Sequence, residues 1–435
     1  MTPNMESAPS GEPCGRLRPP PSRDSVGYWW IAVFVIALLL RAGWGIYRFS
    51  VAADSAALEF DDEQQYWNMA QSFRAGAGLQ DELGFLATRM PLYPAALSLV
   101  VKLPYGVGVA KVCHWIIGAA AAALSAGMAS AFFGRRVGIL AGLLVAFDPF
   151  LVFFSSLLLT ESAFVATLVG LTWAMFPLLR GHGDSLGRWV LVGLLASLTV
   201  YVRESGLGLV LVLLGFVALC RRFDRRSLIG TACVLGIVIA ALFPWALRNK
   251  RILGEWCWLT TRGGLSLYDG VGPQATGESN LGNVKQMPAV QGKNEAEWNR
   301  YFLDKSVEAI RDDPGRILRL AGVKVTRMWN PLPNVKTYQS PFVRVVSVAW
   351  MLPLFLSAIV GTVLLWRSGP YGPLFTLFML LPGIYLTLLH SLFVGSIRYR
   401  LGAMPMLEIL AAVAVVSLLE YGRGGVTTEE PNVTG

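Results

Sequence analysis

The sequence has few charged residues for its length. Asp, Glu, Lys and Arg make up 15% of the 435 residues, while 54% are hydrophobic. A soluble globular domain carries about 25% charged residues. This shortage argues against a soluble enzyme, a disordered protein and a nucleic-acid-binding domain. The formal net charge of +9 does not by itself indicate nucleic acid, because a membrane protein can carry such an excess on cytoplasmic loops or at sites for lipid phosphates.

Cysteine and histidine are also scarce. The five cysteines are an odd number and lie far apart, so neither a disulfide framework nor a CxxC zinc pattern is predicted. The three histidines, His114, His182 and His390, are too scattered for a histidine-based metal site. Walker and Rossmann glycine patterns are missing, so no nucleotide site is predicted. No cofactor is therefore required, although carboxylates could bind a divalent metal ion.

Long hydrophobic runs, in contrast, are abundant. A membrane-spanning helix needs about 20 mostly apolar residues. We expect about ten spans, at residues 28–47, 107–132, 137–154, 158–179, 188–201, 206–219, 228–245, 342–366, 371–394 and 401–419. The fold class predicted from this pattern is an all-α polytopic membrane protein.

The charges of the short loops predict how the chain is oriented. Cytoplasmic loops are enriched in Lys and Arg. Alternate short loops and the C-terminal tail carry basic residues, at Arg135, Arg136, Arg180, Arg188, Arg221, Arg222, Arg225, Arg226, Arg367 and Arg423. The first loop on the other side is acidic, with Asp54, Glu59, Asp61, Asp62, Glu63, Asp81 and Glu82. We therefore expect both termini in the cytoplasm, and the bacterial inner (plasma) membrane as the location.

The resulting plan of the chain has seven parts. They are a cytoplasmic disordered tail (1–27), the first transmembrane helix (28–47), an outer loop with interfacial helices and the candidate catalytic residues (48–106), transmembrane helices two to seven (107–245), a large outer loop (246–341), transmembrane helices eight to ten (342–420) and a cytoplasmic tail (421–435). Within the large loop, helices are expected at 295–310 and 315–329. The basic residues of the second helix suit an anionic surface, or equally a plain solvated helix.

The first outer loop contains an acidic helix start. The helical period of residues 60–73 predicts an amphipathic helix on the membrane, and its first turn holds Asp61, Asp62 and Glu63. These carboxylates either complement the helix dipole or provide a general base beside a membrane-surface pocket. Arg89 follows, just before a second interfacial or re-entrant helix.

Several ionisable residues fall at the outer ends of the expected spans, and Arg41 lies inside the first span. The others are Glu161, Arg203, Glu204, Arg248, His390, Arg398 and Arg400. Ionisable groups at this depth are costly unless they are paired or hydrated, so a functional site is the default hypothesis. A guanidinium group binds phosphate with two hydrogen bonds. The set therefore suggests a phospholipid-like ligand, with its phosphate on arginines and a carboxylate free to remove a proton.

With these residues in place, the sequence resembles the polyprenyl-phosphate-sugar-dependent glycosyltransferases of the C-type superfold. Within that superfold it is most similar to the family 39-like branch of protein O-mannosyltransferases and lipid A aminoarabinose transferases. The matching pieces occur in family order and cover about residues 28–419. They are Asp62-Glu63-x-x-Tyr66, Arg89-Met-Pro-Leu-Tyr-Pro94, Leu159-Thr-Glu-Ser162, Tyr201-Val-Arg203, Pro244-Trp-Ala-Leu-Arg-Asn249 with Gly254, Gly263-Gly264, Asp313-Pro-Gly315 and Arg398-Tyr-Arg400 with Pro405.

The resemblance implies an inverting transfer of a sugar from a polyprenyl phosphate, with an acidic residue of the first outer loop as the base. That residue matches Asp62, although the neighbouring Asp61 leaves the choice between the two open, and Glu63 is a third candidate. Here Arg89-Met90-Pro91 replaces the commoner Arg-Pro-Pro. Candidate ligands of the donor phosphate are Arg89, Arg203, Arg248, Arg398 and Arg400, and candidate contacts of the sugar or acceptor are Tyr66, Glu161, His390 and Tyr399.

The expected partners are the lipid-linked donor, membrane lipids and an acceptor that is a glycan, a lipid or a protein. An alternative function is a transporter or flippase of a lipid-linked or anionic substrate. Such a protein should place ionisable residues near the bilayer midplane and often shows repeated halves. Neither feature is evident in this sequence. A scaffold that keeps the fold without the chemistry is a third hypothesis.

Overall fold

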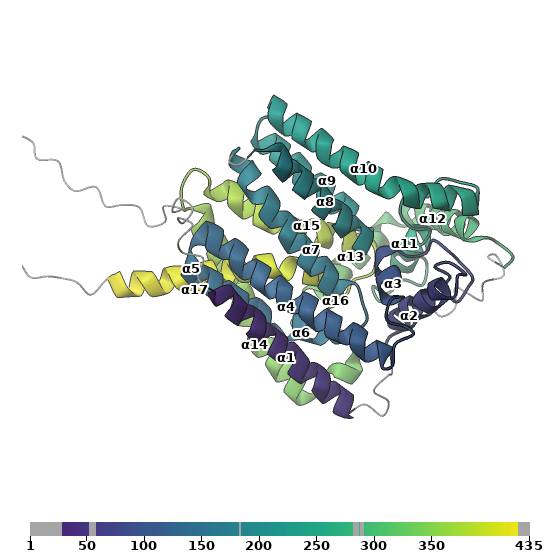
Figure 1. Ribbon diagram of the computed structural model, residues 1–435, viewed down its shortest axis with the longest axis horizontal. Coiled ribbons are helices and arrows are strands. Elements are labelled where there is room, and N and C mark those ends of the chain that lie inside the picture. The colour runs from purple at the N-terminus through teal and green to yellow at the C-terminus, as the bar shows by residue number, and fades with distance from the viewer. Residues whose placement is uncertain (1–27, 52–57, 182–183, 282–286, 288–290, 425–435) are drawn as a thin grey trace, which may run out of the picture.

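The computed structural model of the chain describes residues 28–51, 58–181, 184–281, 287 and 291–424. These residues form helices and connecting turns with no β-strand among them, which confirms the all-α fold class. The expected N-terminal and C-terminal tails lie almost entirely outside the described residues. In Figure 1, helices α5 and α17 lie at one end of the molecule, and α2, α3, α11 and α12 lie at the other end.

Within the described residues, seven helical stretches are long and apolar enough to cross a membrane. They include α1 (Trp29–Val51), α4 (Gly106–Phe133), α7 (Glu161–Met175) with its 3-10 extension η2 (Phe176–Arg180), α10 (Arg225–Leu253), α14 (Pro341–Trp366), α15 (Gly372–Leu392) and α17 (Met404–Gly424). Mean hydropathy in their most apolar windows is between 1.7 and 2.2. The chain is therefore an integral membrane protein, as expected.

The expected number of ten spans is not confirmed. Helices α8 (Leu186–Val202) and α9 (Gly206–Cys220) are apolar but have only 17 and 15 residues. At a rise of 1.5 Å per residue, such helices are about 22–26 Å long, shorter than the ~30 Å hydrocarbon core. The expected span at 137–154 is broken into α5 (Arg135–Phe147) and α6 (Pro149–Phe154). The break occurs because Pro149 has no N–H, and the Asp148 carboxylate caps α6 through the N–H groups of Phe150 and Leu151.

Small residues allow close packing of the membrane helices. Gly142 of α5 faces α4, where a Cβ atom added to Gly142 would lie 2.5 Å from the Cβ of Ala126. Gly361 of α14 similarly packs on α17, where a Cβ atom added to Gly361 would lie 1.8 Å from the carbonyl oxygen of Leu410. Such contacts bring backbones together where no hydrophobic effect drives helix association.

Arg41 lies within α1 and is 1% exposed. Its guanidinium donates hydrogen bonds to the carbonyls of Val145 and Ala146, at 3.3 Å each, at the end of α5. A cation at a helix C-terminus satisfies carbonyls that lack intrahelical partners. Arg41 therefore stabilises the broken helix pair, and it does not join the site predicted for the outer ends of the spans.

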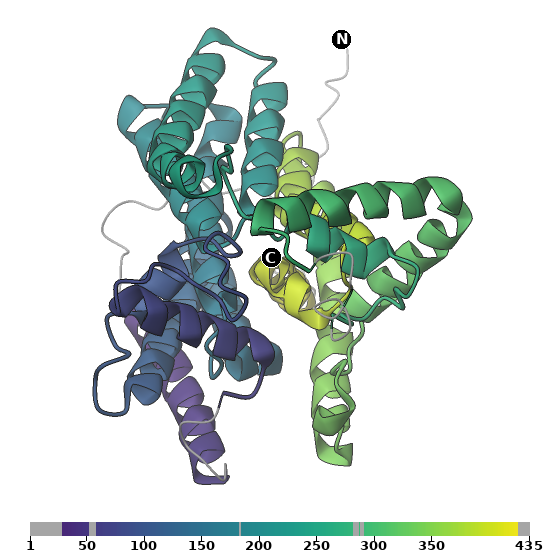
Figure 2. The same cartoon turned by 90° about the vertical axis from the view of Figure 1, so that its right-hand side faces the viewer.

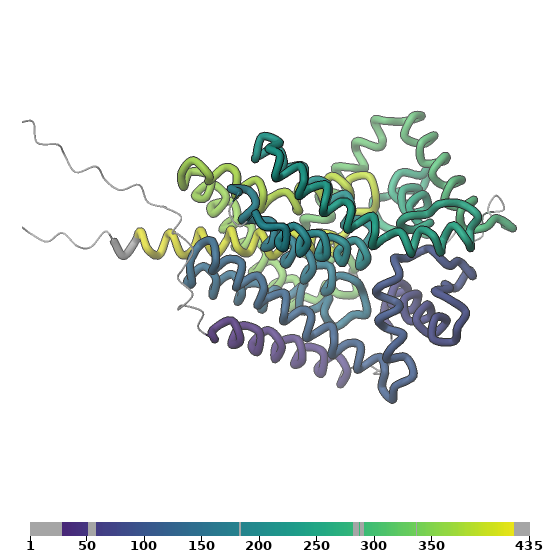
Figure 3. The backbone as a smooth tube through the Cα atoms, turned by 45° about the horizontal axis from the view of Figure 1, so that its top comes forward, coloured from purple at the N-terminus to yellow at the C-terminus, as the bar shows by residue number. Residues whose placement is uncertain are grey.

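The remaining helices belong to the two long loops and the segment before α17. The first loop provides α2 (Asp61–Arg74) and α3 (Leu92–Leu97), and the second provides α11 (Gly263–Val271), α12 (Glu295–Asp312) and α13 (Pro314–Met328). Figures 2 and 3 show the two loops beside each other at one end of the molecule, with α2 on one side and α12 and α13 on the other. The short helix α16 (Ile397–Arg400) precedes α17.

Candidate active site

A large cavity lies where the two outer loops meet the membrane helices. Its volume is about 1940 Å³. Its walls include residues of α1, α2, α6, α11, α14, α15 and α16. Its polar residues include Asp62, Tyr66, Arg89, Arg203, Glu204, Arg262, Asp269, His390, Arg398 and Tyr399. The cavity is large enough for a lipid-linked ligand and has a cationic region on its wall.

The three acidic residues at the start of α2 point in different directions. Successive residues of a helix are rotated by about 100°, so neighbours cannot face the same surface. Asp62 lines the cavity, Asp61 is exposed, and Glu63 is fully buried on the other side. Of the three candidates for the base, only Asp62 reaches the cavity.

Glu63 fixes the position of α2. Its carboxylate accepts hydrogen bonds from the backbone N–H groups of Glu59 at 2.9 Å and Phe60 at 3.2 Å, which closes the N-terminus of the helix. Its other oxygen accepts the N–H of Leu158 at 2.7 Å. Leu158 lies three residues before Glu161, so this bond ties the helix that carries Asp62 to the segment that carries Glu161.

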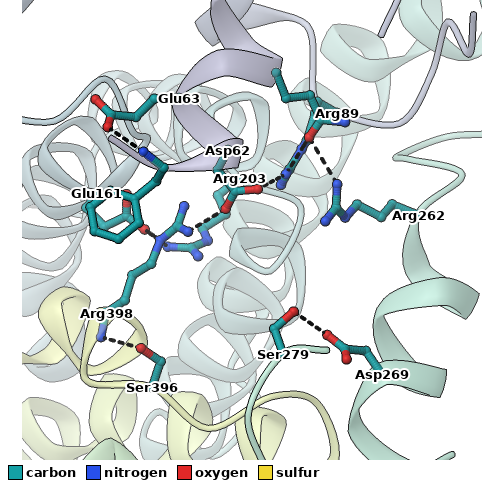
Figure 4. Close-up of polar contacts among 12 residues, drawn as sticks. Asp62, Glu63, Arg89, Glu161, Arg203, Arg262, Asp269, Ser279, Ser396 and Arg398 are labelled. Carbon is teal, nitrogen blue, oxygen red and sulfur yellow. Dashed lines mark hydrogen bonds and ion pairs between the residues drawn. The ribbon is translucent and has the colours of Figure 1, made fainter. Parts of the chain in front are cut away.

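Asp62 is held between two arginines that come from distant parts of the chain. Arg89 Nη2 donates to one carboxylate oxygen at 2.5 Å, and Arg398 Nη1 donates to the other at 2.5 Å (Figure 4). Burial alone would raise the pKa of Asp62, but the positive charges of Arg89 and Arg398, with that of Arg262, hold it well below its usual value. Asp62 is therefore ionised and fully paired in this structure.

Arg398 also connects Asp62 to a second carboxylate. Its Nε donates to Oε1 of Glu161, which is 2% exposed and begins α7. The same oxygen accepts a longer bond of 3.4 Å from Arg203 Nη1. Glu161 does not line the cavity but lies behind Arg203 and Arg398, where it orients their guanidinium groups.

Two residues of this cluster were not predicted from the sequence. Oε1 of Gln65 accepts hydrogen bonds from Arg89 Nη2 at 2.7 Å and from Arg262 Nη1 at 3.0 Å. Gln65 lies one turn after Asp62, and Arg262 directly precedes the Gly263-Gly264 motif. Their positions next to Asp62 and the glycine motif were the features of the sequence that could have identified them. Arg262 also lines the cavity and adds a fourth guanidinium to this cluster.

The aromatic candidates line the cavity beside the arginines. Arg89 lies over the ring of Tyr66, 5.0 Å from its centre, and Arg203 lies over Tyr399 at 5.2 Å. The rings of Tyr399 and His390 are stacked with their centres 3.7 Å apart. The structure thus brings together Tyr66, His390 and Tyr399 with the ion-pair cluster.

Arg400 and Arg248, both predicted to bind the donor phosphate, lie outside the cavity lining. Arg400 is fully buried and donates to the carbonyls of Met328 and Asn330 at 3.0 and 2.5 Å. Two residues along a helix correspond to a rotation of about 200°, so Arg398 and Arg400 face opposite sides of α16. Arg248 donates to the Leu86 carbonyl at 2.7 Å and stacks on Trp245.

Glu295 of α12 joins the two outer loops. Its carboxylate accepts the N–H groups of Leu86 and Ala87 at 3.0 Å each and the hydroxyl of Thr261 at 2.9 Å. Thr261 N–H also donates to the Ala87 carbonyl at 2.9 Å. The two segments joined here continue into Arg89 and Arg262, so Glu295 helps to position both guanidinium groups.

The second outer loop adds a carboxylate to the opposite part of the cavity wall. Asp269 of α11 accepts hydrogen bonds from the Ser279 hydroxyl at 2.7 Å and from the Asn280 N–H at 2.8 Å (Figure 4). Burial raises the pKa of Asp269, although these two bonds oppose the change. Asp269 therefore adds a carboxylate to the candidate residues of the cavity.

The basic residues of α13 mostly make contacts within the protein. Arg316 donates to the carbonyls of Val271, Gly272 and Pro273, and Lys324 is fully buried and donates to Ser391 and Leu392. Arg327 forms an ion pair with Glu278 at 2.8 Å. These three side chains thus make contacts within the protein that neither interpretation of this helix anticipated.

The sequence left open whether carboxylates of this chain bind a divalent metal ion. Among the residues that the structure describes, no group of three or more His, Cys, Asp or Glu side chains is placed to hold one. Both oxygens of Asp62 have arginine partners.

Comparison with known proteins identifies the fold. No protein-family model and no curated protein sequence matches the chain. Among solved structures, it is similar to the oligosaccharyltransferase AglB of Archaeoglobus fulgidus in complex with an inhibitory peptide and a dolichol-phosphate, with TM-score 0.57, 13% identity, and coverage of 94% of this chain and 53% of that chain. The apo form of the A. fulgidus enzyme matches with TM-score 0.57, 14% identity, and coverage of 92% and 52%. The chain thus spans about half the length of these oligosaccharyltransferases.

A second protein appears in the same comparison. ArnT of Cupriavidus metallidurans bound to undecaprenyl phosphate matches with TM-score 0.41, 16% identity, and coverage of 92% of this chain and 79% of that chain. At this level of identity, the similarity to AglB concerns the fold alone. It confirms that the chain has the C-type glycosyltransferase fold that its sequence motifs suggested.

Proposed function

We propose that this chain is an integral-membrane glycosyltransferase. It moves a sugar from a polyprenyl phosphate to an acceptor and inverts the anomeric carbon, with Asp62 as the base. The observation that carries the proposal is the Asp62 carboxylate held between Arg89 and Arg398 on the wall of a cavity of about 1940 Å³. The resemblance in sequence motifs and the shared fold support the same reaction.

The cationic region of the cavity suits a phosphate group. Four of the guanidinium groups on the cavity wall, those of Arg89, Arg203, Arg262 and Arg398, belong to the cluster around Asp62. Their nearby carboxylates are Asp62, Glu161 and Glu204, which leaves an excess of positive charge. The donor phosphate is a diester that spreads one negative charge over two free oxygens, and it accepts two parallel hydrogen bonds from one guanidinium. It can therefore take over arginine contacts from Asp62.

This exchange would activate the base. While Arg89 and Arg398 contact Asp62, its pKa is held well below its usual value, so the carboxylate is a weak base. When the donor phosphate binds these arginines, their effect on Asp62 is partly neutralised and its pKa rises. The protein then carries a free carboxylate only when the donor is in place.

The chemical step follows from this arrangement. An acceptor hydroxyl attacks the anomeric carbon while the bond from that carbon to the phosphate oxygen breaks, and the bonding electrons leave with the prenyl phosphate. The acceptor proton passes to Asp62, and the arginines stabilise the charge on the leaving phosphate. Base and leaving group on opposite faces of the sugar give inversion. Tyr66, the Tyr399–His390 stack and Asp269 are placed to contact the sugar or the acceptor.

We also propose that the cavity opens on the extracytoplasmic side of a bacterial inner membrane, with both termini in the cytoplasm. Arg135 and Arg136 begin α5, at the opposite end of the molecule from α2 and α12 in Figure 1. Basic residues in short loops favour the cytoplasmic side. The side of the membrane can be tested by labelling single cysteines in α2 with a reagent that does not cross membranes.

Transfer of label tests the proposed function. Membranes containing the protein are incubated with radiolabelled prenyl-phosphate sugars, and the distribution of the label between donor and acceptor fractions is measured. We expect Asp62→Asn to lower transfer by about 10²- to 10⁴-fold, which is the usual contribution of a general base. Asp61→Asn is the matched control, because Asp61 is the exposed neighbour on the same helix, and it should keep near-normal transfer.

The same experiment separates the proposed function from its alternatives. A transporter or flippase would leave the label on the prenyl phosphate with either variant. A scaffold would transfer no label at all. Equal turnover by Asp62→Asn and the unmodified protein would show that Asp62 is not the base.

A further inference from the structure

The cavity contains a second cationic region, formed by Arg48 at the end of α1 and Lys111 in the second turn of α4. Both residues line the cavity, as does Ser156. This region interacts with a different set of charges from the Asp62 cluster. Glu63 interacts electrostatically with both Arg48 and Lys111. Asp62 instead interacts electrostatically with Arg89, Arg398 and Arg262.

Lys111 is a buried cation without a close partner. Its side chain is 6% exposed. Its ammonium group lies over the ring of Phe49, 5.1 Å from the centre. Among the residues that the structure describes, it has neither a hydrogen bond nor an ion pair. Lys111 lines the cavity, so its ammonium group is available to an anion bound there, and such an anion would supply the partner that the surrounding protein does not.

Glu63 does not meet this need. Its two oxygens already accept the N–H groups of Glu59, Phe60 and Leu158. These bonds fix the carboxylate at the start of α2, so it cannot move to Lys111 without opening the helix. Glu63 lowers the cost of burying Lys111 from a distance and leaves the ammonium hydrogens free.

Arg48 completes the region with a group whose partners can be exchanged. Its Nη1 donates to the Ser156 hydroxyl at 2.9 Å, and its Nη2 pairs with Glu59. The Glu59 side chain is 30% exposed and also accepts the Tyr338 hydroxyl at 2.7 Å. The Arg48 and Glu59 side chains are 15% and 30% exposed, and a phosphate that displaces Glu59 can replace its contact with two parallel hydrogen bonds to the guanidinium.

The cavity that Arg48 lines also has apolar wall residues. They include Leu39 and Trp44 of α1 and Phe342 and Val346 of α14. Leu39 and Phe342 are also 66% and 76% exposed on a membrane protein, so the cavity is bordered at these residues by surfaces that contact lipid chains. In Figure 2, α1 lies at the lower left and α14 at the lower right. An aliphatic chain attached to the bound anion would find apolar side chains of both helices on the cavity wall.

We propose that Arg48 and Lys111 bind the phosphate of a second ligand, a phosphate monoester or diester, which is distinct from the donor phosphate at Arg89 and Arg398. The apolar walls favour an ester with aliphatic chains. In the proposed glycosyltransferase this ligand is the acceptor, so the acceptor would be an anionic lipid. That last assignment rests on the proposed function, whereas the second phosphate site does not.

Counting bound ligands tests the site without an activity assay. The purified full chain in maltoside micelles is mixed with dodecyl phosphate, and native mass spectrometry gives the number bound per chain. We expect two for the unmodified protein, one for Lys111→Met and one for Arg398→Gln. Lys111→Arg should bind two, because it keeps the charge. Lys102→Met, which removes an exposed lysine nine residues earlier, is the matched control and should also bind two.

The outcomes separate the two proposals. Two ligands bound to Lys111→Met would overturn the second site and leave the donor site intact. One ligand on the unmodified protein, lost in Lys111→Met and kept in Arg398→Gln, would support the second site and contradict the donor phosphate site. Arg48→Gln carries the same expectation as Lys111→Met, and it replaces that variant if thermal unfolding shows that Lys111→Met does not fold.

A parallel titration identifies the source of the phosphate. Inorganic phosphate and dodecyl phosphate compete for the site in the Arg398→Gln variant, where only the Lys111 region remains. We expect dodecyl phosphate to bind at least tenfold more tightly, because its chain contacts the apolar walls. Equal affinities would confirm a phosphate site but would overturn the lipid ligand in favour of a free anion.

Discussion

The Asp62 region and the Glu295 region are both rich in charged side chains, but those charges have different partners. Around Asp62, carboxylates and guanidinium groups contact one another on a cavity wall. Around Glu295, the carboxylate and Arg248 contact the backbone of residues 86 and 87. Backbone atoms cannot leave the fold, whereas a side-chain partner can be replaced by a ligand. The difference suggests that paired charges on the cavity wall bind substrate and that backbone-bound charges hold the wall in place.

The largest expected effect distinguishes Arg398 from Arg400, which face opposite sides of α16. Arg398→Gln removes a donor to both Asp62 and Glu161 and should lower transfer by about 10²- to 10³-fold, as is typical for loss of one group that stabilises transition-state charge. Arg400→Gln leaves the cavity wall intact, so its main effect should be on stability. Transfer assays on equal amounts of folded protein measure the first effect.

The control for this pair is chemical unfolding. Arg400 donates to the carbonyls of Met328 and Asn330, and loss of a charged donor from buried acceptors costs about 1–3 kcal/mol in the free energy of unfolding. The expected difference between the two arginines would be contradicted if Arg400→Gln folded normally and lost as much transfer activity as Arg398→Gln.

This pair also shows what sequence alone could and could not reveal. Three sequence patterns pointed to members of the cluster. The motif Arg398-Tyr-Arg400 contains Arg398, the acidic start of α2 contains Asp62, and Arg89 precedes the second interfacial helix. The pattern could not say which arginine faces the cavity, because that depends on whether the segment is helical. Once α16 is known to be a helix, two residues of separation exclude a shared face.

Other features depended on contacts across long sequence distances. Glu295 bonds to Leu86 and Ala87, more than 200 residues away, and no local pattern marks such a pairing. Gln65 was missed because an uncharged amide is not expected in an ionic cluster. The break at Asp148-Pro149 was missed because the hydropathy of residues 137–154 is continuous, although the proline was a local signal.

A medium-sized effect is expected for Glu295→Gln. The amide keeps the shape of the side chain but offers one acceptor oxygen in place of two, so an N–H group of Leu86 or Ala87 loses its partner. We expect the protein to lose about 1–3 kcal/mol of stability and the KM for the donor to rise more than kcat falls, because Arg89 and Arg262 are less well positioned. Asp304→Asn, on an exposed part of the same helix, is the control and should change neither quantity.

The smallest expected effect is a shift in the pH profile, which tests how the arginines act on Asp62. In the unmodified protein, arginines hold the pKa of Asp62 well below its usual value, so the carboxylate stays ionised as pH falls to acidic values. Arg89→Gln removes one of these charges, so the pKa of Asp62 rises. The acidic limb of the pH profile of kcat/KM should therefore move to higher pH. Lys102→Gln, which removes an exposed charge outside the cavity, should leave the profile unchanged.

The exchange of arginines between Asp62 and phosphate is tested most directly by the affinity for a prenyl phosphate that carries no sugar. Asp62→Asn removes the carboxylate that competes for Arg89 and Arg398. The variant should therefore bind the prenyl phosphate at least as tightly as Asp61→Asn and the unmodified protein, although it transfers sugar far more slowly. Weaker binding by Asp62→Asn, in protein with normal thermal unfolding, would contradict the account.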